Sequence, residues 1–170
     1  MERTKPEVSA RVLVAGIGNL FLGDDAVGCE VARRLQDLAA LPGVRVVDYG
    51  IRGMHLTYDV QDAWDLVVLV DAIPGRDHPG KVEVLEVRPD EAAAGQLDTH
   101  GMDPASVLCA VVAMGGALPR TLLVGIHVAD SEEGIGLTDA VAAAVDRAAE
   151  AVRMLVHEHV APARDVERVS

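Results

Sequence analysis

Three short segments of the chain are apolar almost throughout, and they constrain the fold more than any other feature of the sequence. They are residues 11–16 (RVLVAG), 66–70 (LVVLV) and 121–128 (TLLVGIHV). Apolar runs of this length are typical of strands buried on both faces, as in a parallel sheet covered by helices. Because segments with a helical repeat alternate with these runs, the sequence predicts a three-layer α/β/α sandwich with a mostly parallel sheet.

The remaining elements are expected between and after these strands. Residues 25–41 place Val27, Val31 and Leu35 on one face of a helix that Pro42-Gly43 ends. Residues 81–87 alternate charged and apolar side chains, which indicates a half-exposed strand at an edge of the sheet. Further elements are predicted at residues 44–48 (a strand) and at residues 53–58, 103–115 and 138–159 (helices).

Length and composition favour one globular domain. The 170 residues suit a single domain over residues 1–170, with a core at about 11–159 and loose termini at 1–10 and 160–170. A net charge of −12 and only four aromatic residues (one Phe, two Tyr, one Trp) argue against nucleic acid as a partner. With no recognisable signal peptide, no apolar run long enough for a bilayer and two widely separated cysteines, we expect a cytoplasmic, monomeric protein without a membrane partner.

Two acidic residues follow the first predicted strand. Ligands of parallel sheets bind beyond the carboxyl ends of the strands, and Asp24 and Asp25 lie there, at the start of the first predicted helix. One aspartate is explained as a helix cap, but a second is not needed for capping. Because the helix dipole favours an ionised carboxylate at this end, either residue is also suited to bind a cation.

Asp71 follows the apolar strand at residues 66–70. A charge at the tip of a buried strand is unfavourable unless it is paired, hydrogen-bonded or bound to a metal. Asp71 is therefore either a turn former that accepts bonds from its own loop amides or a ligand. Two aspartates with a histidine are compatible with zinc, iron, nickel or manganese. Chemistry alone does not distinguish His100 from the other histidines, of which the chain has six in all.

The same region also suggests a dinucleotide-binding fingerprint. Gly16 and Gly18 lie between a strand and a helix, and Asp48 closes the second strand, where a ribose-binding acid is expected. However, Phe21 occupies the position of the third glycine, and the two aspartates at the helix start would repel a pyrophosphate. A dinucleotide-binding oxidoreductase is therefore the alternative function.

The motifs in their order resemble the hydrogenase maturation endopeptidases, which remove the C-terminal tail of a NiFe-hydrogenase large subunit. The likeness spans about residues 11–155. It implies a phosphorylase/hydrolase-like mixed sheet of five strands with one antiparallel strand, for which residues 81–87 are the candidate. The matching motifs are VLVAGIGN (12–19), GDDAVG (23–28), DYG (48–50), VDA (70–72) and GIGLT (134–138).

The resemblance also implies the site and the reaction. The family's metal ligands fall on Asp25, Asp71 and His100, and its metal is the nickel carried by the substrate, with no organic cofactor. The expected function is that of an aspartic-type endopeptidase that trims the large-subunit precursor once nickel has been inserted. A non-catalytic chaperone of the same fold that only checks for nickel is a further alternative.

Overall fold

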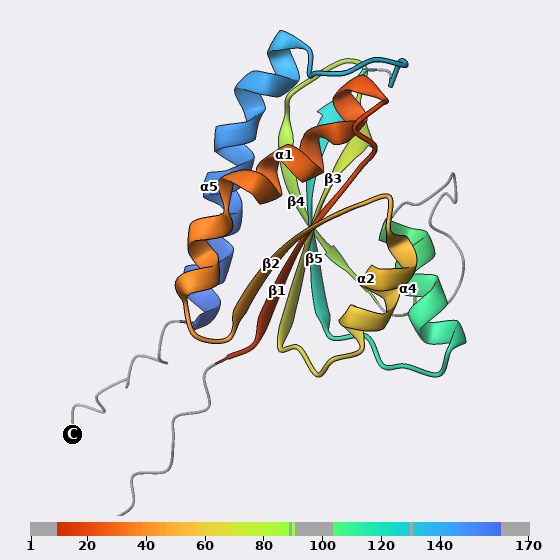
Figure 1. The fold of residues 1–170 in the computed structure, drawn as a ribbon, viewed down its shortest axis with the longest axis vertical. Helices are drawn as coiled ribbons and strands as arrows, with labels where there is room; N and C mark the ends of the chain where they lie inside the picture. The colour runs from red at the N-terminus through yellow and green to blue at the C-terminus, as the bar shows by residue number, and fades with distance from the viewer. Residues whose placement is uncertain (1–9, 89, 91–103, 130, 161–170) are drawn as a thin grey trace, which may run out of the picture.

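A five-stranded mixed sheet lies at the centre of the part of the chain that the structure describes (Figure 1). This computed structural model describes residues 10–88, 90, 104–129 and 131–160. The strand order is β2-β1-β3-β5-β4, and β4 alone runs antiparallel to its neighbour, which confirms the predicted edge strand. The strands are β1 (Val12–Ile17), β2 (Val44–Gly50), β3 (Leu66–Pro74), β4 (Val82–Val87) and β5 (Arg120–Val128).

Helices cover both faces of this sheet (Figure 1). One face carries α1 (Val27–Arg34) and α5 (Asp139–Val160), and the other carries α2 (Gly53–Val60) and α4 (Pro104–Ala113). The 3₁₀ helices η1 (Gly23–Ala26) and η2 (Gln36–Ala40) flank α1. Within the described residues, no helix combines the length and the apolar character that a membrane span requires. The predicted three-layer α/β/α sandwich is confirmed.

Two apolar cores form because successive residues of a strand point to opposite faces of the sheet. Val12 and Val14 of β1 are fully buried in the core beneath α1 and α5. Leu13 and Ala15, also fully buried, belong to the core beneath α2 and α4. Alternation of this kind explains why the strand segments are apolar throughout: both faces of the sheet are covered.

The prediction of one continuous helix over residues 25–41 is wrong. The structure divides this segment into η1, α1 and η2. The Leu35 N–H donates to the Ala32 carbonyl at 3.1 Å and the Leu38 N–H to the Leu35 carbonyl at 3.0 Å, which is the i to i−3 pattern of a 3₁₀ turn. Residues three apart eclipse in such a turn, so Leu35 and Leu38 are both buried on the sheet side (0% and 2% exposed).

The third strand is longer than predicted. Its expected end at Val70 is wrong, because β3 pairs with β5 as far as Pro74 and Val128. Its pairing with β1 stops earlier, at Gly16 and Val70. Asp71 is therefore not a loop residue but the first residue of β3 beyond its pairing with β1.

A clamp joins η1 to the start of α5. Asp24, only 4% exposed, accepts the Thr138 N–H at 2.7 Å and the Thr138 hydroxyl at 2.9 Å. The Thr138 carbonyl in turn accepts the Ala142 N–H at 2.8 Å, which starts the helix. The Thr138 hydroxyl is thus donated to Asp24, and the carboxylate lies at the positive end of α5, where it is favoured.

Replacing Asp24 with Ala should lower the free energy of unfolding by about 1–3 kcal/mol, because the Thr138 N–H and hydroxyl both lose their charged acceptor. The matched control is Asp146→Ala, which removes a carboxylate that is 79% exposed and paired with Arg34. That change should have an effect of less than about 1 kcal/mol. Urea denaturation measures both, and equal losses in the two variants would contradict the clamp.

Candidate functional site

The candidate site lies at the carboxyl ends of β1 and β3. The next strand in the chain, β2, lies on one side of β1, whereas β3 lies on the other side. The strand order therefore reverses at β1. In open α/β sheets, crevices that bind ligands form at such points. The segment after β1 and the residues of β3 beyond Val70 both face this point.

Two glycines bring the first helix unusually close to these strand ends. A Cβ atom on Gly28 would lie 2.2 Å from the carbonyl oxygens of both Ile17 and Val70. A Cβ on Gly18 would lie 2.0 Å from the carbonyl oxygen of Asp25. Only glycine permits these approaches, so the start of α1 is seated directly on the ends of both strands.

Asp25 lies on η1, one turn before this contact. Its Oδ2 accepts the Asn19 N–H at 2.8 Å, and the side chain is half-buried. The Asn19 side chain is also held in place, because its Oδ1 accepts the Phe21 N–H at 3.0 Å. Among the described residues, no hydrogen-bond donor is bonded to Asp25 Oδ1. The carboxylate is therefore held by one oxygen, and the other can meet a ligand.

Asp71 is the second predicted ligand. It is 7% exposed, and its Oδ1 accepts the N–H of the following residue, Ala72, at 2.8 Å. This is the local amide bond that the turn-forming alternative predicts, although the residue belongs to a strand. The bond to Ala72 orients the carboxylate at the end of β3.

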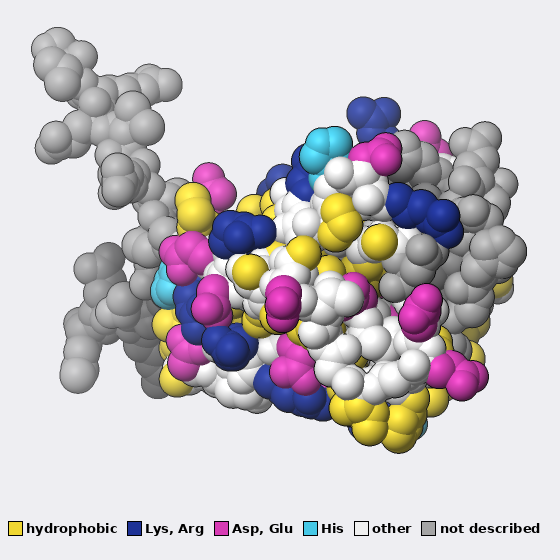
Figure 2. Space-filling view, turned by 90° about the horizontal axis from the view of Figure 1, so that it is seen from above, with side chains coloured by type: hydrophobic (Ala, Val, Ile, Leu, Met, Phe, Trp, Pro, Cys, Tyr) yellow, Lys and Arg dark blue, Asp and Glu magenta, His cyan; other side chains and the backbone are white. Residues whose placement is uncertain are grey.

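The structure brings Asp25 and Asp71 to the same end of the sheet, because η1 packs against β3. Asp24, the neighbour of Asp25, is instead engaged by Thr138. His100 lies outside the described residues, as does Asp103, the first residue of the helix predicted at 103–115. Within the described residues, no three His, Cys, Asp or Glu side chains gather as a metal site would require. Figure 2, the view from above onto this end, shows separate acidic side chains among apolar ones.

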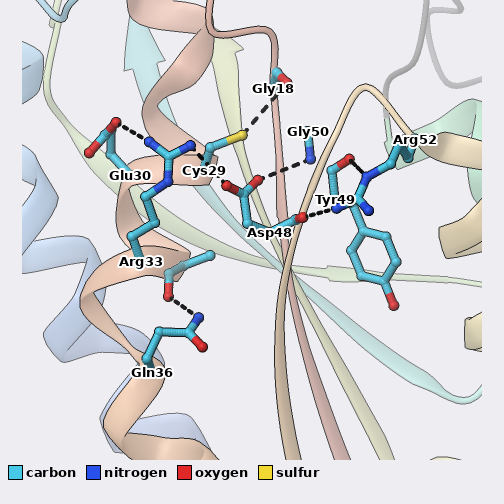
Figure 3. A network of polar contacts seen from close by, with 10 residues as sticks. Gly18, Cys29, Glu30, Arg33, Gln36, Asp48, Tyr49, Gly50 and Arg52 are labelled. Carbon is cyan, nitrogen blue, oxygen red and sulfur yellow. Dashed lines mark hydrogen bonds and ion pairs between the residues drawn. The ribbon is translucent and has the colours of Figure 1, made fainter.

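Asp48, the acid expected to bind a ribose in the alternative function, is engaged within the protein. Arg33 of α1 reaches Asp48 Oδ2 at 3.1 Å, and the Gly50 N–H donates to Oδ1 at 3.1 Å (Figure 3). The Arg52 guanidinium donates to the Asp48 carbonyl. These contacts tie the end of β2 to α1 and occupy the acid that a dinucleotide would need.

Cys29 lies in the same network and is not a nucleophile. Its thiol is fully buried and donates to the Gly18 carbonyl, at 3.6 Å (Figure 3). Burial, reinforced by the Asp48 carboxylate, raises the pKa of the Cys29 thiol to about 12. The thiol is therefore protonated at neutral pH. Cys109 is half-buried.

Three of the described histidines, His127, His157 and His159, have environments that a structural role explains. His127 Nε2 lies 2.9 Å from Glu83 Oε2, so its ring is hydrogen-bonded within the sheet. Lys81 and His127 hold the pKa of Glu83 below its ordinary value. His157 and His159 lie in the last turn of α5, where a positive charge complements the helix dipole.

A shallow hollow extends the site along β3 and β5. It has a volume of about 490 Å³ and opens just beyond Asp71, where the two strands end. No motif in the sequence indicated it, since it depends on how far β3 and β5 continue together. Its lining consists of Pro74, Gly75, Arg76, Val128, Ala129 and Ser131.

Known proteins resemble the chain over most of its length. The model of the hydrogenase maturation protease family matches residues 29–154. The hydrogenase 2 maturation protease of Escherichia coli (strain K12) is 33% identical over 153 residues, which are 87% of this chain and 92% of that protein.

Solved structures agree with the sequence comparison. The hydrogenase maturating endopeptidase HybD from Escherichia coli superposes with a TM-score of 0.71 at 30% identity, covering 87% of this chain and 93% of that one. The NiFe-hydrogenase maturation protease HycI from Thermococcus kodakarensis KOD1 gives a TM-score of 0.70 at 25% identity, over 88% and 94% of the two chains. With the family model matching well over half of its residues, the chain belongs to the hydrogenase maturation protease family, a family of peptidases.

Proposed function

We propose that this protein removes the C-terminal extension of a NiFe-hydrogenase large-subunit precursor after nickel has been inserted, and that Asp25, Asp71 and His100 recognise that nickel. The observation that carries the proposal is the placement of Asp25 and Asp71 on two adjoining segments at the switch point of the sheet. Membership of the hydrogenase maturation proteases supports the substrate class.

The chemistry of the two carboxylates suits recognition of a divalent cation. Oxygen and imidazole ligands are compatible with nickel, and a bound cation offsets the repulsion between two nearby negative charges. A precursor without nickel would leave these charges unneutralised against its own surface, which weakens its binding. The site therefore discriminates by penalising the wrong substrate as well as by attracting the right one.

The same carboxylates are placed to act on the attacking water. An aspartate near the scissile bond can accept a proton from water, as in aspartic-type peptidases, and this step follows docking of the nickel centre. The buried Cys29 thiol is excluded from this role by its protonation at neutral pH. The hollow beyond Asp71 provides room for the extension that is released.

The nickel requirement can be tested with two preparations of one precursor. The purified protein should shorten the nickel-loaded large-subunit precursor and leave the nickel-free form intact, as read by intact-mass spectrometry. Cleavage of both forms at equal rates would contradict nickel recognition. Binding of the loaded precursor without any change in its mass would instead indicate a chaperone of the same fold.

Asp71→Asn should reduce the rate of processing by at least about a hundredfold, because the neutral amide neither binds the cation nor accepts a proton as a carboxylate does. The fold should persist, since the amide oxygen can still accept the Ala72 N–H. The matched control is Asp62→Asn, which makes the same change at an exposed position after α2. Full activity of Asp71→Asn would remove this residue from the site.

A further inference from the structure

Two exposed loops lie side by side next to the candidate site. One follows β1 and carries Phe21, and the other precedes α5 and carries Ile135. They are joined by a parallel bridge between Leu22 and Gly134. The Gly134 N–H donates to the Phe21 carbonyl and the Gly23 N–H to the Gly134 carbonyl, each at 2.9 Å. Backbone bonds on both sides of the bridge hold the loops in a defined relative position.

The clamp between Asp24 and Thr138 adds to this hold. It bonds the residues that immediately follow each loop, at 2.7 and 2.9 Å, with the carboxylate almost fully buried. The first loop is bonded again at its start, where Asn19 donates to Asp25. The two loops and Asp25 therefore form one connected unit.

This unit presents two large apolar side chains to solvent. Phe21 is 70% exposed and Ile135 is 85% exposed, and neither belongs to the two cores of the molecule. Folding does not explain them, because they bury little surface and a polar residue would serve equally well in an exposed loop. Single exposed apolar residues are ordinary, but neighbouring ones on loops fixed by hydrogen bonds are characteristic of contact sites.

We propose that Phe21 and Ile135 form a docking surface for the large-subunit precursor, hereafter the Phe21/Ile135 surface. This inference rests on the proposed function, since it names the surface that meets the substrate around its nickel. The proximity of this surface to the candidate site indicates the partner that binds it. Phe21 lies four residues before Asp25, on the loop that the Asn19 N–H bonds to the Asp25 side chain. A protein that brings a buried metal centre to Asp25 must cover this loop.

The charges around the surface specify the chemistry of the partner. Glu132 and Glu133 are exposed on the second loop, immediately before the bridge. The matching face of the precursor should therefore have an apolar centre with basic residues around it. Figure 2 shows this end of the molecule with apolar side chains exposed among acidic and basic ones.

The test is the double variant Phe21→Ser/Ile135→Ser, assayed on the nickel-loaded precursor. KM should rise about tenfold or more, as expected when apolar anchors of an interface are truncated, whereas kcat should change less than about twofold. The matched control is Met154→Ser, which removes an apolar side chain that is 65% exposed near the far end of α5. Its KM should equal that of the wild type.

The outcomes separate this inference from the proposed function. If the wild type cuts the precursor and the double variant has an unchanged KM, or loses only kcat, the Phe21/Ile135 surface is not a docking surface, and the proposed function stands. If the wild type does not cut, the proposed function fails. In that case Kd for the loaded precursor, from calorimetric titration, decides the surface: a tenfold weaker Kd for the double variant supports it, and an equal Kd overturns it.

Discussion

The contact between the start of α1 and the carboxyl ends of β1 and β3 is the constraint on which the rest of the structure depends. It exists because Gly28 has no side chain: a Cβ there would lie 2.2 Å from two strand carbonyl oxygens. Gly18 allows the backbone of Asp25 to approach in the same way. A side chain at either position would lift the helix from the sheet and carry Asp25 away from β3. Gly18, which suggests a phosphate-binding loop in the sequence, thus serves helix packing here.

The two aspartates of η1, Asp24 and Asp25, are placed differently by this contact. Asp24 is directed toward Thr138 and is buried, so it fixes the loop to α5. Asp25 is half-buried and is held by the Asn19 N–H alone among the described residues. Adjacent residues of identical chemistry are therefore divided between a structural role, for Asp24, and the ligand role that we propose for Asp25. What divides them is the direction of each side chain on a 3₁₀ turn, because neighbouring residues of a helix point to different sides.

The layers and the strand positions could be predicted from the sequence because they depend on local periodicity. β1 and β5 differ from their predicted ranges by single residues at their ends, and β4 is the predicted edge strand. The end of β3 could not be predicted, since it depends on pairing with β5 some 54 residues later. Thr138, the partner of Asp24, lies 114 residues later in the chain, and no sequence pattern predicts this contact. At the site, Asp25 and Asp71 follow from the rule that ligands bind at strand ends, whereas His100 rests on family resemblance.

The manner in which the two carboxylates are held bears on the nickel recognition that we propose. Each is oriented by a backbone N–H close to it in the chain, from Asn19 for Asp25 and from Ala72 for Asp71. Neither bond requires the ligand, so the oxygens are positioned before the precursor arrives and little conformational entropy is lost on binding. The protein as a whole carries a net charge of −12, which opposes the approach of further negative charge and favours a divalent cation. In the proposed function, a preorganised and negatively charged site of this kind would respond to the charge of the incoming centre, which changes when nickel is inserted.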